Sequence, residues 1–187
     1  MKIKELGLKG VFEIQLEPHK DERGFFARTY DDKIFKEWGI DKKWVQENSS
    51  LSKVKGTIRG MHFQHPPYDE TKLLRAITGE MFFGVIDLRK GSETFGKWTS
   101  LILSAEKMNL LYVPRGCVNG MCTLTENCIL AYKVDNYYSK EKEDIIKWND
   151  PNVGIEWPIK EPVVISERDS KGQSFKEFVK KYGGIEL

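Results

Sequence analysis

The sequence predicts an all-β protein built as an antiparallel sandwich or barrel. Most of the chain falls into short apolar segments rich in β-branched and aromatic residues. Gly, Pro, Asn or Asp separates these segments at intervals typical of strands joined by turns. Two segments alone have the period of an amphipathic helix, so helices are expected at the periphery.

The predicted strands follow one another closely along the chain. They cover residues 11–16, 44–51, 57–64, 72–77, 81–88, 98–103, 109–114, 117–125 and 128–134. Thr78-Gly79-Glu80 lies between two apolar runs and predicts a tight hairpin. The loop at 64–71 contains Pro66-Pro67 and polar residues, so we expect it at the rim of a pocket.

Two short helices are predicted outside the strands. Residues 31–39 place Phe35 on an apolar face, and the segment ends in a glycine suited to a C-terminal cap. Ser174 and Glu177 have the spacing of a capping box, which predicts a C-terminal helix around 174–182.

Length and composition favour one soluble domain over residues 1–187, with no linker or repeat to divide it. Apolar residues make up 40% and charged residues 31%, which excludes disordered, collagenous and coiled-coil classes. The formal charge of +2 predicts neither a nucleic-acid nor a lipid surface. No segment has the length of a membrane span or the apolar core of a signal peptide, so we expect a cytoplasmic protein with a small-molecule site.

The three cysteines, Cys117, Cys122 and Cys128, are predicted to be buried reduced thiols in strands. Their odd number argues against a disulfide framework. A zinc site is the alternative, but their spacing matches no common zinc pattern and no histidine lies near them.

Histidine is the side chain best suited to proton transfer near neutral pH, and the chain has three. His62 lies in a strand-like run with Arg59, and regular pairing would put the two on opposite faces. A bulge at Gly60 would bring both to one side, as bulges near active sites do. The alternative is a half-buried histidine bonded to a backbone carbonyl.

Further groups complete the inventory of a proton-transfer site. Lys72 opens an apolar strand, a Pro-x-Gly turn carries Asn119, and residues 131–138 bring several phenols to a strand end. Each feature has an ordinary structural explanation, but together they supply a base, a cation and an acid. Deprotonation beside a carbonyl and reprotonation from the other side require these three groups.

These residues lie in longer runs that resemble the dTDP-4-dehydrorhamnose 3,5-epimerases, from about Val11 to Asp169. The runs include Asp21-Glu-Arg-Gly-Phe-Phe26, Gln46-Glu-Asn48, Arg59-Gly-Met-His-Phe-Gln64, Val113-Pro-Arg-Gly116, Tyr132-Lys133, Tyr137-Tyr138 and Ser166-Glu-Arg-Asp169. The resemblance implies a cupin-like β jelly roll with a few short peripheral helices. It also implies a homodimer that epimerises a nucleotide-linked 4-keto-6-deoxy sugar without a cofactor, in deoxysugar and polysaccharide biosynthesis.

The resemblance assigns the catalytic roles. His62 would be the base and Asp169 would orient its ring, while Tyr132 would return a proton to the opposite face of the sugar. Lys72 would stabilise the enolate oxygen, a contribution worth roughly 10²-fold or more in rate.

The resemblance also assigns binding roles. Arg23 and Arg59 would contact the diphosphate and sugar, and Tyr138 would stack on the nucleotide base. Residues near the bound nucleotide would be Gln46, Glu47, Asn48 and Glu143.

Two positions depart from the family. Asn119 stands where the family has a histidine, and it can offer an amide hydrogen bond but carries no proton. A metal-binding cupin would use a histidine here, so we predict no metal. Arg28 replaces a glutamate near the nucleotide; it can donate, or pair with an acid such as Glu47.

Three interpretations therefore remain open. The first is epimerisation at both carbons beside the ketone of a dTDP-linked sugar. The second is a single-carbon (3- or 5-) epimerase or a ketoisomerase, on a CDP-linked or other nucleotide-linked sugar. The third is a non-catalytic cupin that binds a sugar nucleotide.

Overall fold

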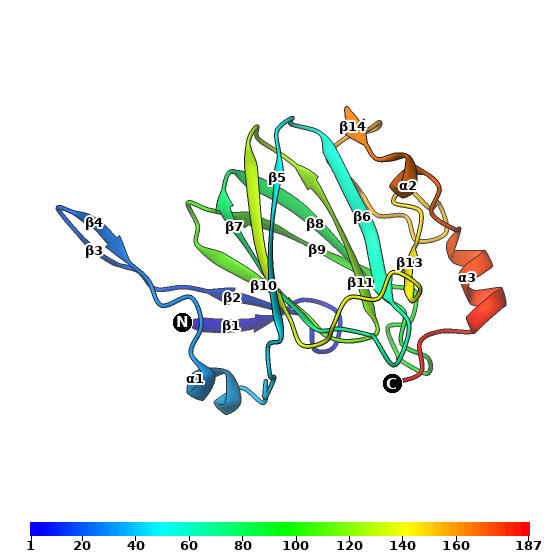
Figure 1. Cartoon of the computed structure of the whole chain (residues 1–187), viewed down its shortest axis with the longest axis horizontal. Coiled ribbons are helices and arrows are strands. Elements are labelled where there is room, and N and C mark those ends of the chain that lie inside the picture. Colours follow the sequence, from blue (N-terminus) through cyan, green and yellow to red (C-terminus); the bar gives the residue numbers. More distant parts are fainter.

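Two six-stranded sheets lie face to face in the computed structural model, which describes all residues from 1 to 187 (Figure 1). The first sheet has the order β1 (Lys2–Glu5), β2 (Phe12–Gln15), β10 (Asn109–Val113), β7 (Lys72–Thr78), β12 (Cys128–Val134), β5 (Gln46–Ser52). The second has the order β13 (Glu143–Ile145), β6 (Thr57–Gln64), β11 (Cys117–Thr123), β8 (Glu80–Asp87), β9 (Trp98–Ser104), with β14 (Val164–Ile165) parallel to β6.

From β5 onward the chain passes repeatedly between the sheets, since β5, β7, β10 and β12 lie in the first and β6, β8, β11 and β13 in the second. Within each sheet the neighbours on the main path are antiparallel. This crossing pattern makes a cupin-like jelly roll and confirms the predicted fold class.

All the predicted strands are present, and both predicted helices occur as α1 (Asp32–Glu37) and α3 (Phe175–Tyr182). The capping box of Ser174 and Glu177 is formed at the start of α3. Short elements escaped prediction: β1, β13, β14, the hairpin of β3 (His19–Asp21) and β4 (Gly24–Phe26), and α2 (Glu167–Ser170). Each has four residues or fewer, too short for a periodic pattern.

The predicted hairpin at Thr78–Glu80 is wrong. β7 and β8 follow each other through Gly79 but lie in different sheets, so the turn is a corner of the sandwich. Gly79 has a φ of +76°, and a Cβ there would come within 2.5 Å of the Thr125 hydroxyl. Glycine is required at such a corner as much as in a hairpin, so the turn signal alone could not separate the two.

The main core fills the space between the sheets. Leu74, Leu111 and Leu130 from the first sheet pack with Phe83 and Leu103 from the second, and all five are buried. Outside this layer, Phe35 of α1 packs over the first sheet. Phe178 of α3 packs against Phe63 of the second sheet with ring centroids 5.6 Å apart. The two helices therefore cover outer faces and leave the interior to strand side chains.

The three cysteines are free and buried, as predicted. Burial raises the pKa of Cys117 to about 12 and that of Cys122 to about 11, which keeps both thiols protonated. No group of three or more His, Cys, Asp or Glu side chains is arranged to hold a metal ion. The helices are all too short or too polar to cross a bilayer.

A buried carboxylate organises the turn after β8. Asp87 is fully buried and accepts hydrogen bonds from the Arg89 guanidinium at 2.8 Å and from the Ser92 and Thr94 hydroxyls, each at 2.6 Å. Burial by itself raises the pKa of Asp87, but these hydrogen bonds outweigh it and lower the pKa to about 2.

This depressed pKa predicts a component of acid sensitivity. The carboxylate of Asp87 stabilises the fold above its unfolded pKa of about 3.9, and this contribution is lost as pH falls toward 2. The loss amounts to about 2 kcal/mol of unfolding free energy. Urea unfolding at a series of pH values should show a shallower acid loss for Asp87→Asn than for the unmodified protein. Parallel curves would contradict the assignment.

Candidate active site

Five of the predicted site residues, drawn from both sheets, line one cavity of about 200 Å³ inside the sandwich. Arg59, His62 and Asn119 come from the second sheet, and Lys72 and Tyr132 from the first. The remaining wall is formed by Ser50, Leu74, Phe83, Met121 and Leu130. The fold thus brings polar groups that are distant in the sequence into one small and partly apolar chamber. Arg59 and Tyr132, for example, are 73 positions apart.

A bulge in β6 directs Arg59 and His62 to the same side. Asn119 of β11 lies opposite His62 and Met121 lies opposite Arg59, so two steps along β11 match three along β6. Gly60 sits within this bulge with a φ of +116°, and a Cβ there would come 2.6 Å from the Cα of Gly120. The bulge predicted from sequence is confirmed, and the close approach of the two strands requires glycine.

Asp169 forms a hydrogen bond with the imidazole ring of His62. Its Nε2 lies 2.8 Å from Asp169 Oδ1, and the other carboxylate oxygen accepts the Gly60 N–H at 3.1 Å. Burial by itself raises the pKa of Asp169. The hydrogen bonds with His62, Gly60 and Ser166 have the larger effect, so the net pKa lies below its ordinary value. An ionised Asp169 accepts a hydrogen bond from Nε2–H, so in its neutral form the ring presents Nδ1 as its hydrogen-bond acceptor.

Tyr132 lies on β12, in the sheet opposite His62, and its side chain enters the same cavity. Burial, and then the charges of Glu70 and Glu143, raise the pKa of its phenol. The phenol therefore stays protonated near neutral pH. An imidazole and a protonated phenol consequently occupy two opposite walls of one chamber.

Asn119 carries an unsatisfied acceptor in this chamber. Its side chain is 8% exposed, and its Oδ1 has no hydrogen-bond partner in the protein. A buried acceptor left in this state costs about 1–3 kcal/mol, which a hydroxyl donated by a ligand would recover.

Three of the residues expected near the nucleotide form a second group. The Tyr138 hydroxyl donates to Glu143 at 2.6 Å, and its backbone N–H donates to the Gln46 side chain at 2.9 Å. Arg168, which no sequence pattern selected, pairs with Glu143. Asn48 lies between this group and the cavity along β5, because it is paired with Tyr132 of β12 in the first sheet.

Three other predicted residues do not reach the cavity of their own chain. Glu47 is exposed and pairs with Lys133 at 2.6 Å, while Arg28 pairs with Asp31 at 3.1 Å. The predicted pairing of Arg28 with Glu47 is therefore wrong, because each has a nearer partner of opposite charge. Arg23 lies at the turn between β3 and β4, paired with Asp21.

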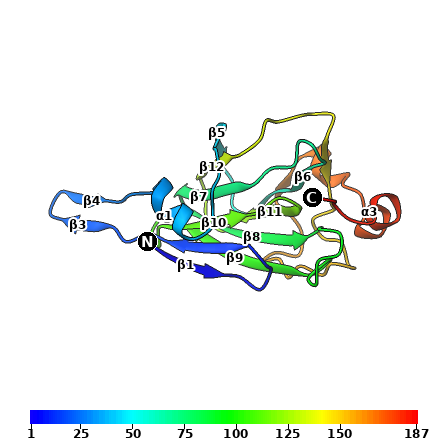
Figure 2. The ribbon, with the colours of Figure 1, turned by 90° about the horizontal axis from the view of Figure 1, so that it is seen from below.

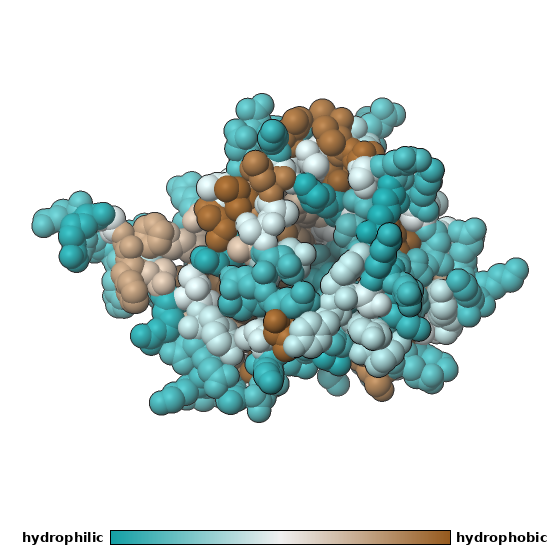
Figure 3. Space-filling model, in the orientation of Figure 1, coloured by the Kyte–Doolittle hydropathy of each residue, from teal (hydrophilic) through white to brown (hydrophobic).

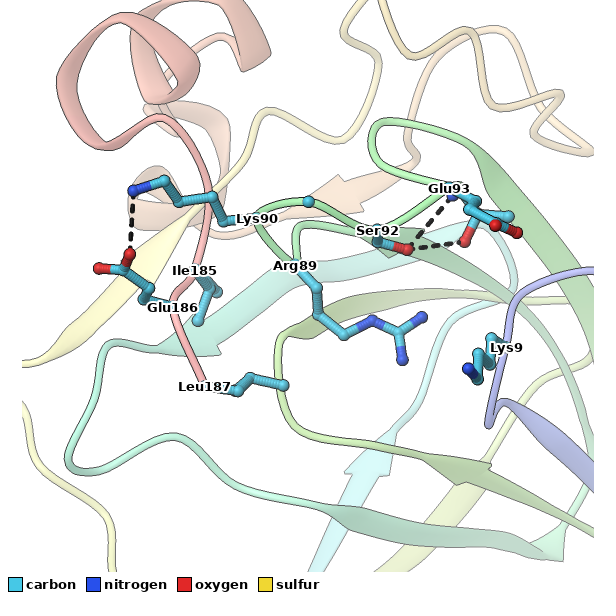
Figure 4. A pocket seen from close by; sticks show the side chains of 10 residues that line it. Lys9, Arg89, Lys90, Ser92, Glu93, Ile185, Glu186 and Leu187 are labelled. Atoms are coloured by element: carbon cyan, nitrogen blue, oxygen red, sulfur yellow. Dashed lines mark hydrogen bonds and ion pairs between the residues drawn. The ribbon is translucent and has the colours of Figure 1, made fainter.

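A larger hollow lies elsewhere, at the C-terminal residues (Figure 4). It has a volume of about 720 Å³, and none of the predicted site residues lines it. Two of its basic groups are already paired, Arg89 with Asp87 and Lys90 with Glu186. The smaller cavity between the sheets is the better candidate for chemistry.

A jelly roll of the cupin type, with a histidine–carboxylate pair facing a phenol beside a lysine, defines a class of proteins equipped for proton transfer at carbon. Comparison with known proteins agrees. The family model of dTDP-4-dehydrorhamnose 3,5-epimerase matches residues 5–177. The chain belongs to this family, and it is an isomerase.

Relatives and solved structures resemble the chain over most of its length. The dTDP-4-dehydrorhamnose 3,5-epimerase of Shigella flexneri is 44% identical over 83% of this chain and 85% of its own length. The Legionella pneumophila 3,5-epimerase, solved with dTDP-4-keto-L-rhamnose, is 33% identical with a TM-score of 0.92, covering 100% of this chain and 98% of that one. A 3′-monoepimerase of Streptomyces bikiniensis, solved with dTDP-quinovose, is 27% identical with a TM-score of 0.87, over 97% and 91%.

Proposed function

We propose that this protein epimerises a dTDP-linked 4-keto-6-deoxy sugar at both carbons beside the ketone. The observation that carries the proposal is the placement of His62 and Tyr132 on opposite sheets around one cavity. Binding of a dTDP-sugar in the similar Legionella structure supports the substrate class. A nucleotide-sugar substrate also favours a cytoplasmic location.

The proposed mechanism uses the acidity of hydrogens beside a ketone. Nδ1 of His62 removes the proton from a carbon next to C4, and the electron pair of the broken C–H bond forms an enolate. Asp169 stabilises the resulting imidazolium, and Lys72 stabilises the negative enolate oxygen. Tyr132 then gives its phenolic proton to the other face of that carbon, which inverts the centre. Solvent restores both groups, and no redox step is involved.

Binding is proposed to involve the groups around the cavity mouth. Arg59 would contact the diphosphate, since a guanidinium grips phosphate oxygens in bidentate fashion, and the exposed ring of Tyr138 would stack on the base. Asn119 would accept a hydrogen bond from a sugar hydroxyl through its unpaired Oδ1.

We also propose a homodimer in which the β3–β4 hairpin reaches the partner's site. The hairpin projects from the body in two perpendicular views (Figures 1 and 2). Phe25 and Phe26 on it are 61% and 65% exposed, and they form an apolar patch on the projection in Figure 3. A second copy that covers this patch would bury the two rings and receive Arg23 and Arg28 beside its cavity.

Mixing two inactive variants tests this arrangement. Arg23→Ala chains keep His62, and His62→Ala chains keep Arg23, so a heterodimer contains one complete site if the arginine acts in its partner. Co-expression should restore about a quarter of the activity of the unmodified protein. No recovery, with dimers confirmed by light scattering, would place Arg23 in its own chain's site, and an Arg23→Ala variant that is active by itself would place Arg23 outside any site.

Deuterium exchange tests the reaction itself. The protein is incubated in D₂O with dTDP-4-keto-6-deoxyglucose and separately with its CDP counterpart, and uptake is followed by NMR. We expect uptake with inversion at both C3 and C5 of the dTDP-sugar. Uptake at one carbon would favour the second candidate, a single-carbon epimerase, which Asn119 and the similarity to a 3′-monoepimerase make relevant. Binding without uptake would leave a non-catalytic protein.

A further inference from the structure

The ammonium of Lys72 is nearly enclosed at the cavity wall, where its side chain is 11% exposed. An ammonium has three N–H donors. One is directed to the backbone carbonyl of His62 at 3.4 Å, and a second faces Oε1 of Glu70 at 3.3 Å. Two fixed acceptors determine the direction of the third N–H, which is left for a ligand in the cavity.

Glu70 is itself held firmly. Its side chain is 12% exposed, and its other oxygen, Oε2, accepts a hydrogen bond from Gln64 at 3.1 Å. Gln64 is 3% exposed and is fixed in turn, because its amide also donates to the Tyr68 carbonyl at 2.9 Å and accepts from the Ser139 N–H at 2.6 Å. The carboxylate of Glu70 is therefore a fixed acceptor, and it fixes the position of the ammonium at the end of the long Lys72 side chain.

We infer that Glu70 is a positioning residue that acts through Lys72, fixing the ammonium so that its third N–H meets the oxygen on which negative charge develops. Glu70 does not line the cavity, so it does not touch the substrate. The inference rests on the proposed function, which gives Lys72 an enolate oxygen to stabilise. A cation that is already in place needs no reorganisation during the reaction, and this is the source of the expected rate gain.

A carboxylate beside the ammonium has a second, opposing effect. Its negative charge weakens the positive potential at the enolate oxygen, so a role through charge alone would make Glu70 inhibitory. Glu70→Gln removes the charge and keeps an oxygen acceptor of the same length. Glu70→Ala removes both. The two variants therefore separate positioning from charge.

We expect Glu70→Ala to lower kcat for deuterium exchange about 10- to 100-fold with KM nearly unchanged, and Glu70→Gln to stay within about 5-fold of the unmodified protein. Glu186→Gln is the matched control, because it removes the carboxylate charge from an exposed Glu–Lys pair that does not line the cavity. Equal loss in both Glu70 variants, or faster exchange in both, would overturn the inference.

A double-variant comparison isolates the route through Lys72. If Glu70 acts by holding that ammonium, Lys72→Ala and Lys72→Ala/Glu70→Ala should exchange at the same residual rate, whereas a structural role would make the double variant slower. Thermal unfolding checks that each variant folds. Should Glu70→Ala fail to fold, Glu70→Asp takes its place: its shorter side chain withdraws the acceptor, so it should exchange more slowly than Glu70→Gln. Similar rates for these two would contradict the inference.

The outcome for the unmodified protein separates the two proposals. Absence of exchange in the unmodified protein would defeat the proposed function together with the role of Glu70. Normal exchange in the unmodified protein with unchanged kcat in Glu70→Ala would defeat the role of Glu70 alone.

Discussion

Replacement of His62 with alanine is expected to lower both deuterium exchange and product formation by about 10²- to 10⁴-fold, the range that general bases contribute. Proton removal precedes every later step, so no intermediate can form without the base. Asp169 cannot take over, since it lies behind the ring and its depressed pKa makes it a poor base. NMR of the dTDP-linked ketone in D₂O measures both quantities in one sample.

His65→Ala is the control for this prediction. His65 also forms an imidazole–carboxylate pair, with Asp144 at 3.0 Å, but its ring packs against Tyr182 of α3 on the outside of the sandwich. We expect its loss to reduce stability and leave exchange nearly unchanged. Exchange by His62→Ala within about 10-fold of the unmodified protein would contradict the assignment of the base.

The sheet architecture could be predicted because its signals are local. Runs such as 72–77 and 128–134 are apolar, β-branched and bounded by turn residues, and each became a strand. The turn at Gly79 shows the limit of such signals. Whether a glycine corner closes a hairpin or passes to the other sheet depends on which strands pair, and pairing is decided by contacts distant in sequence.

Some features of the candidate site could likewise be predicted from local sequence signals, and others could not. The bulge at Gly60 could be foreseen because it alone reconciles Arg59 with His62 on one face. The roles of Glu70 and Gln64 could not be foreseen, since a loop glutamate and a strand glutamine carry no pattern until the fold places Glu70 beside Lys72 and Gln64 beside Glu70. The position of Arg28 was also beyond the sequence, because the nearer acid, Asp31, is identified only by the geometry of the start of α1.

Replacement of Tyr132 with phenylalanine is expected to separate exchange from inversion. His62 can still remove a proton, trade it with solvent and return deuterium to the same face, so exchange should persist within about 10-fold. Delivery to the opposite face loses its donor, so net conversion should fall by about 10²-fold or more. Deuterium content and product configuration, read from the same NMR time course, distinguish the two.

Tyr112→Phe is the matched control for this result. Tyr112 is a buried tyrosine of the same sheet, and burial raises its pKa to about 12, but its ring packs with the cluster under α1 instead of entering the cavity. Its loss should leave both exchange and inversion intact. Because the two tyrosines share burial and a raised pKa, a difference between the variants must come from position. Full inversion by Tyr132→Phe would show that another group or a water molecule delivers the second proton, and the site would then need a different acid on the wall facing His62.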